Sequence, residues 1–190
     1  QHSEQLLRCQ STLLTLRDHS PRGINPAETK DAQAAIPPGE GDDLAAFFRL
    51  ATEEISRALG VERVSIWFFD DAREAIVCHD LFRPSHATHD SGQRLVAADF
   101  PAYFKAFTQQ ATVLADDALT HPATCEFAEA YLKPNGITSM LDAPLRLGSD
   151  IAGVLCCEHT GPIRHWMPDE EKFAVSAAAT ILLVRDNERR

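Results

Sequence analysis

The stretches GITSMLDAPL (residues 136–145) and GVLCCEH (residues 153–159) decide the fold. Both are largely apolar, and Gly148-Ser149-Asp150 between them has the composition of a turn, so we predict a β-hairpin. Gly153 has no Cβ atom and would let another backbone or ring approach this hairpin closely. Pro144 cannot donate a hydrogen bond to a neighbouring strand and therefore indicates an edge position or a bulge.

Helices and strands are mixed along the rest of the chain without strict alternation, which predicts an α+β fold on an antiparallel sheet. Apolar residues at helical or alternating spacing, with turn residues between them, define the other elements. The expected helices are a segment from Asp42 or Asp43 to Gly60, Asp99–Gln110, Pro122–Leu132 and a last helix from Pro168 to the C-terminus. The expected strands are Val61–Asp70, Ala75–Phe82, Leu95–Ala98 and Thr112–Ala115.

The first 41 residues differ in composition from the rest of the chain. Residues 1–19 are predicted to form a helix with an apolar stripe, Leu6, Cys9, Leu13 and Leu16. This stripe is either a short coiled-coil seam or a surface that packs on the chain's own domain. Residues 20–41 are rich in Pro and Gly and are predicted to be a linker to a globular domain at 42–190. Because the chain starts at Gln1, we expect it to be part of a longer polypeptide.

Charge and composition exclude several functional classes. With 18 Lys and Arg against 28 Asp and Glu, the net charge of −10 disfavours nucleic acid and anionic lipid as partners. We expect no membrane insertion and no signal segment, and therefore a cytoplasmic location. Five cysteines cannot all pair within one chain, and we expect reduced thiols.

The ordered motifs resemble those of a GAF domain, the sensory module of histidine kinases, phosphodiesterases and cyclic-di-nucleotide enzymes. The resemblance covers about Asp42 to Arg190 and rests on the helix before Gly60, the strand RVSIWFFD (residues 63–70), Tyr131-Leu132, the two stretches quoted above, and Trp166 with Asp169-Glu170. It implies a six-stranded antiparallel sheet with helices on both faces: a dimerising helical layer on one face, a capped pocket on the other, and no chemistry of its own.

A small-molecule pocket is expected between the cap and the sheet. Its aromatic lining and its polar groups are expected to be Trp67, Phe69, Tyr103, Phe107, Tyr131, Ser139, Asp142 and His159. If Ser149-Asp150 is the hairpin loop, Asp142 lies opposite Cys157 and diagonal to His159, which would allow an Asp–His pair. Alternatively, Asp142 accepts backbone amides at a bulge and His159 lies on the surface.

The sequence does not identify a cofactor. Without a pair of CxxC motifs or an HExxH motif, we expect no metal site. Members of the GAF family that carry a bilin attach it through a Cys often followed by His, whereas Cys125 precedes Glu126. Of the signature of the cyclic-nucleotide-binding members, only Asp169-Glu170 and an aromatic residue, Trp166, are present.

We therefore predict a non-catalytic sensor that passes a signal through its terminal helices to an output domain in the same chain. A parallel homodimer is expected through Leu6, Leu13 and Leu16 and a small-residue face of the last helix, Ala174, Ala177, Ala178, Ile181, Leu182 and Arg185. Two alternatives remain: a thiol-based redox sensor or reductase that uses Cys125 with Cys156 or Cys157, and a ligandless dimerisation domain.

Overall fold

The structure, a computed structural model, describes residues 1–18 and 40–189. The predicted linker therefore lies outside the described residues, apart from Glu40 and Gly41, which already belong to helix α2 (Glu40–Leu59). Helix α2 thus begins two or three residues before the expected start at Asp42 or Asp43. It ends as predicted at Gly60, whose φ of +64° suits glycine.

The predicted α+β fold on an antiparallel sheet is confirmed. Within the described residues the sheet has seven strands in the order β3-β2-β1-β7-β6-β5, with β4 also paired to β2. One short strand, β3, was not predicted. The strands are β1 (Arg63–Phe69), β2 (Ala75–Arg83), β3 (Thr88–Asp90), β4 (Arg94–Val96), β5 (Val113–Ala115), β6 (Ile137–Leu147) and β7 (Asp150–Thr160).

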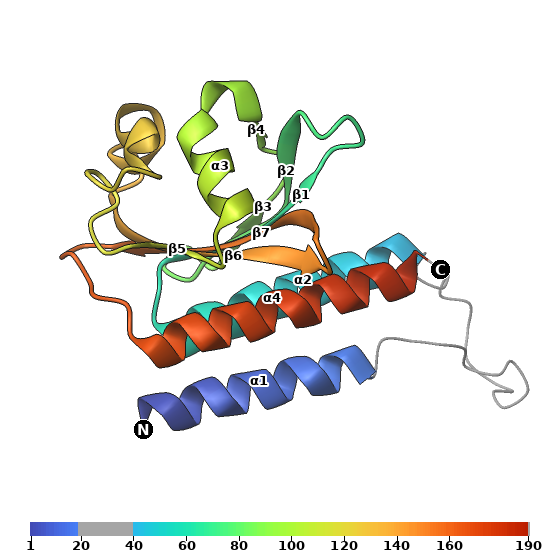
Figure 1. The fold of residues 1–190 in the computed structure, drawn as a ribbon. Coiled ribbons are helices and arrows are strands. Elements are labelled where there is room, and N and C mark those ends of the chain that lie inside the picture. Colours follow the sequence, from blue (N-terminus) through green and yellow to red (C-terminus); the bar gives the residue numbers. More distant parts are fainter. Residues whose placement is uncertain (19–39, 190) are drawn as a thin grey trace, which may run out of the picture.

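Helices cover both faces of the sheet (Figure 1). One face carries the helical layer, in which α2 and α4 (Pro168–Glu188) lie against the sheet and α1 (His2–Asp18) packs on the outer side of these two helices. The other carries a cap, which comprises α3 (Pro101–Gln109) and the segment that follows β5. Pro101 begins α3, where its missing N–H needs no partner.

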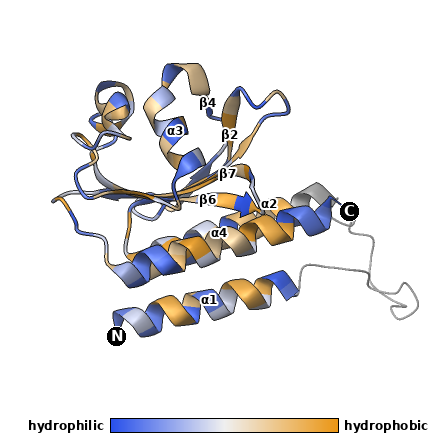
Figure 2. Ribbon diagram, in the orientation of Figure 1, coloured by the Kyte–Doolittle hydropathy of each residue, from blue (hydrophilic) through white to orange (hydrophobic). Residues whose placement is uncertain are grey.

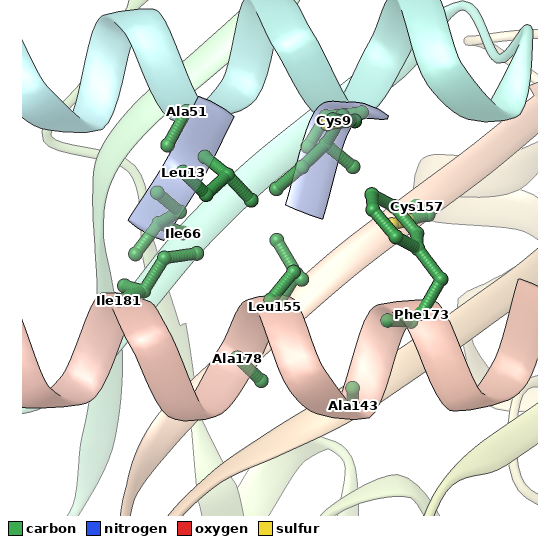
Figure 3. Packing of buried hydrophobic residues seen from close by; sticks show 14 of the residues in the cluster. Cys9, Leu13, Ala51, Ile66, Ala143, Leu155, Cys157, Phe173, Ala178 and Ile181 are labelled. Atoms are coloured by element: carbon green, nitrogen blue, oxygen red, sulfur yellow. The ribbon is translucent and has the colours of Figure 1, made fainter. Parts of the chain in front are cut away.

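Helix α1 packs on α2 and α4 of its own domain. Its residues Leu6, Cys9 and Leu13 are at most 4% exposed, and hydrophobic residues recur along all three helices (Figure 2). Figure 3 shows Cys9 and Leu13 in the same cluster as Ala51 of α2 and Ile181 of α4. Of the two interpretations of the α1 stripe, the structure shows the intramolecular one.

The central strands are buried on both faces, which explains their nearly continuous apolar sequence. On β1, Ile66 and Phe68 face the helical layer, whereas Trp67 faces the cap. The expected role of Gly153 is borne out, because a Cβ atom there would lie 1.9 Å from the carbonyl oxygen of Trp67 on the neighbouring strand β1. Pro144 lies beyond Asp142, the last β6 residue that pairs with β5, and so occupies the predicted edge position.

The predicted register of the β6–β7 hairpin is wrong by one residue. Asp142 lies opposite Cys156 rather than Cys157. The loop is Gly148-Ser149 instead of Ser149-Asp150, and a bulge interrupts the ladder between Leu145 and Arg146. Because a slip of one residue exchanges the two faces of a strand, Asp142 shares the cap face with Cys156, and the expected Asp142–His159 pair does not form.

The predicted helix Pro122–Leu132 is also only partly correct. The chain there forms a short 3₁₀ turn at Cys125–Phe127 and a π-helical turn at Ala128–Leu132. In the π turn the amide of Lys133 donates to the carbonyl of Ala128, at 3.0 Å. Phe127 and Leu132, at either end of this wider turn, are both buried between the cap and the sheet.

Candidate functional site

Asp142 is the central polar group between the cap and the sheet. It is fully buried and accepts a hydrogen bond of 2.5 Å from the Tyr103 hydroxyl of α3 at its Oδ2 atom. The Tyr103 oxygen also lies 3.6 Å from the Cys156 sulfur. Oδ1 of Asp142 has no hydrogen-bond partner. Burial raises the pKa of Asp142 to about 7, with Glu158 contributing in the same direction and the Tyr103 hydroxyl opposing it.

A second polar group, formed by Arg63, Glu158 and Tyr131, lies on the same side of the sheet. The Arg63 Nε donates to Glu158 at 2.7 Å, and the Tyr131 hydroxyl donates to the other oxygen of Glu158 at 2.9 Å. Arg63 and Glu158 are 6% and 2% exposed. Burial raises the pKa of Glu158 and the Arg63 guanidinium opposes this rise. Among the described residues, Arg63 is the only cation that contacts Glu158.

The predicted aromatic residues come together under the cap, but they pack against one another. Phe69 stacks on Phe107 with ring centroids 5.8 Å apart, and Tyr103 lies 5.2 Å from Phe107 and 4.8 Å from Phe127. Trp67, Tyr103 and Phe107 are 4%, 1% and 0% exposed. These side chains fill the interior between the cap and the sheet. Trp67 and Phe69 of β1 both face this interior.

Ser139 and His159 lie away from this interior. The Ser139 hydroxyl donates to the Asp116 carbonyl at 2.7 Å and accepts from the Arg164 amide at 2.9 Å, in the segment before α4. His159 lines a surface cavity of about 430 Å³ beside the C-terminal end of α2, together with Ser56, Val61 and Phe82. Burial and the Arg164 cation lower the pKa of His159.

Glu170 joins the helices of the helical layer. It is 2% exposed, accepts a hydrogen bond of 2.9 Å from the Met167 amide at the start of α4, and lies 2.9 Å from Nε2 of His2 on α1. The Arg164 guanidinium pairs with Glu170 and also donates at 2.9 Å to the carbonyl of Leu59 at the end of α2. One carboxylate therefore connects the ends of α1, α2 and α4.

Sequence reasoning missed Arg63, Glu158, Arg164 and Glu170 as a set. The signal for Glu158 is its position inside an apolar strand, since such a residue needs a buried partner. Its partner is 95 positions earlier in the chain, and nothing in the spacing connects them. A further missed cluster joins α2 to the sheet edge: His89 bridges Asp80 and Glu53, each at 3.0 Å.

No metal centre forms in the part of the chain that the structure describes: no three His, Cys, Asp or Glu side chains converge in a way that could hold an ion. Among the same residues, no helix has both the length and the apolar character that crossing a bilayer requires. Side chains that can bind metals do meet at the His89 bridge and at the His165–Asp116 contact of 2.8 Å, but each of these is a hydrogen-bonded pairing within the fold.

The model of the GAF domain family matches residues 43–183. The chain belongs to the GAF domain family. GAF domains are regulatory sensor domains, and the helical layer and capped sheet face are in accord with this assignment. None of the curated proteins compared with the sequence matches it significantly.

Solved GAF domains share the fold at low sequence identity. The GAF domain of a phosphoenolpyruvate-protein phosphotransferase from Coxiella burnetii has a TM-score of 0.69 at 15% identity, covering 100% of this chain and 97% of that one. A phycocyanobilin-bound GAF domain from a cyanobacterial phytochrome has a TM-score of 0.70 at 15% identity, covering 97% and 95%. The free methionine-R-sulfoxide reductase of Neisseria meningitidis, solved with its substrate, has a TM-score of 0.62 at 13% identity, covering 97% and 92%.

Proposed function

We propose that this GAF domain is a non-catalytic, cytoplasmic regulatory module that signals through its terminal helices to an output domain in the same polypeptide. The observation that carries the proposal is the helical layer. Helices α1 and α4 pack side by side with α2 and meet at Glu170, so a displacement of one helix changes the contacts of the others. A ligand or partner that favours one arrangement by a few kcal/mol would be sufficient to shift it.

The input is proposed to be a small molecule or a protein partner, with neither nucleic acid nor membrane involved. A small molecule would have to displace Tyr103 or Phe107, because these side chains occupy the space between cap and sheet. This filled interior favours a second candidate function, a ligandless dimerisation domain. The phycocyanobilin of the cyanobacterial relative suggests a ligand class, but Cys125 is exposed and lies 3.8 Å from the carbonyl of Pro122 instead of facing the interior.

Native mass spectrometry of the protein purified from its own host discriminates between the two candidates. The sensor proposal is supported by a mass excess that remains under native conditions and is lost on unfolding. The mass of the polypeptide alone, or of its multiples, would instead support the ligandless domain. The Phe107→Ala variant is an informative comparison, since it opens space in the interior and should increase occupancy by a bound small molecule.

The thiol-based alternative predicts reactive cysteines, whereas the structure buries four of the five. Burial raises the pKa of Cys9 and of Cys78 to about 12, and raises that of Cys156 well above its ordinary value. Titration of the folded protein with Ellman's reagent should therefore show one fast thiol, lost in Cys125→Ser, and four that react only on unfolding. Two or more fast thiols would support a redox function.

The predicted homodimer needs a surface other than the residues first expected, because Leu13 and Ile181 are at most 1% exposed within the single chain. Four exposed apolar residues remain for such a stripe, Leu7 and Leu14 on α1 and Val175 and Leu183 on α4, and they are 36–64% exposed. A cavity of about 380 Å³ between these helices is lined by Leu7 and Phe173. We propose this stripe as the dimer surface.

Sedimentation at tens of micromolar tests the dimer. We expect a dimer for the unmodified chain and a monomer for Leu7→Asp combined with Leu183→Asp, since a charge in an apolar interface is costly. Leu147→Asp, at a residue of similar exposure at the end of β6, should remain dimeric. A monomeric unmodified chain, or a double variant that remains dimeric, would contradict the proposed surface.

A further inference from the structure

The interior under the cap contains more acidic groups than cations. Asp142 and Glu158 are both buried, and Arg63 pairs with Glu158. Asp142 therefore has no cation of its own. Its neighbours from the packed elements are the Tyr103 hydroxyl on α3 and the Cys156 thiol on β7, and the β5 residue opposite it, Val113, cannot titrate.

Helix α3 is held on the sheet at this point. Tyr103 is the residue of α3 that reaches the sheet with a polar atom, and its 2.5 Å bond to Asp142 is buried. The start of α3 is tied separately, by the Glu126 carboxylate, which accepts hydrogen bonds from the amides of Ala102 and Tyr103 at 3.1 and 3.2 Å. The Tyr103–Asp142 hydrogen bond depends on a carboxyl group whose other oxygen, Oδ1, has no hydrogen-bond partner. The hydrogen bonds to Glu126 lie near solvent.

We propose that Asp142 is a proton-dependent latch that holds α3 against the sheet in its neutral form and loosens the cap when it ionises. A neutral carboxyl group can remain in this interior without a counter-ion. The carboxylate is stabilised by water, which reaches Asp142 only when α3 and Tyr103 move away. This device goes beyond the proposed signalling function and does not depend on the identity of a ligand.

The direction of the pH effect follows from the two states. In the closed state the pKa of Asp142 is about 7, against an ordinary value of 3.8 that applies once water reaches the group. Opening therefore releases a proton between these two pH values and releases none above the higher one. The cap should be tightest in acid, loosen as the pH rises toward neutrality, and change no further once Asp142 is ionised in both states.

Amide hydrogen exchange of α3, corrected for the intrinsic pH dependence of exchange, measures this opening directly. Between about pH 5 and 7, we expect the protection of residues 102–109 to fall by up to about tenfold per pH unit, and then to level off. Asp142→Asn should remove this dependence. In Tyr103→Phe, the pH at which protection levels off should be higher, because the Tyr103 hydroxyl favours the ionised form of Asp142.

His121→Gln is the matched control, since His121 borders α3 in a groove of about 410 Å³. It should leave the pH dependence unchanged. The proposal is overturned if α3 protection does not vary with pH, if Asp142→Asn retains the variation, or if His121→Gln removes it.

A measurement on the unmodified protein keeps the test independent of how the variants fold. In protein labelled with ¹³C at the aspartate carboxyl carbon, one resonance should titrate near pH 7. If every aspartate titrates below about pH 5, the latch does not exist.

Discussion

Replacing Gly153 with alanine is expected to destabilise the domain by about 3 kcal/mol or more, at or above the upper end of the range for overpacked cores. The added Cβ would lie 1.9 Å from the Trp67 carbonyl oxygen and 2.8 Å from the Phe68 Cα. Both are backbone atoms of β1, so no side-chain rotation can relieve the overlap, and the central β1–β7 pair must separate. Chemical denaturation followed by circular dichroism measures the loss.

Gly148→Ala is the matched control in the same hairpin. Nothing lies within 4 Å of a Cβ atom at Gly148, whose φ is +62°. This substitution should therefore cost only about 1 kcal/mol, from the left-handed backbone conformation. Equal losses for the two variants would show that close strand packing at Gly153 is not the cause.

Arg63→Met is expected to cost about 3–5 kcal/mol at neutral pH, because it leaves the buried Glu158 carboxylate without its cation. Glu158 is 2% exposed and would retain only the Tyr131 hydroxyl as a donor. Burial already raises the pKa of Glu158, and loss of Arg63 removes the group that opposes this rise. The deficit of the variant should therefore shrink as the pH falls and Glu158 takes up a proton.

Arg63→Met combined with Glu158→Gln tests the cause of that loss. The neutral glutamine can still accept from Tyr131, so the double variant should recover a large part of the stability at neutral pH. Denaturation curves for the single and double variants at two pH values give the comparison. If Glu158→Gln gives no recovery on the Arg63→Met background, the loss comes from packing of the arginine side chain rather than from the uncompensated charge.

Local patterns in the sequence were sufficient for most elements of the sheet and for the interior location of the aromatic residues. Alternation and β-branched residues defined β1, β2, β6 and β7, and Gly60 and Pro101 marked helix ends. The register of the β6–β7 hairpin could not be predicted in the same way. It depends on which two residues form the turn and on one bulge, and neither leaves a distinct signal in the composition.

The candidate site was less accessible to sequence reasoning because its partners are distant in the chain. Asp142 was singled out as a polar residue within an apolar strand, but its partner is Tyr103, and His159 belongs to another surface. The apolar stripe of α1 was correctly located. Whether it packs on its own domain or on a second chain could not be predicted, since either surface would bury the same apolar side chains.

Two spin labels on the helical layer test the central claim, that α1 packs on α4 and is joined to it at Glu170. Arg8 and Ala179 are exposed on these two helices and can carry the labels in a Cys125→Ser background. Pulsed electron resonance should give a narrow distance distribution for this protein, and a broader one when Glu170→Gln is added, because that change weakens the contacts with Arg164 and His2. A broad distribution before Glu170 is changed, or one that the substitution leaves unaltered, would contradict the account.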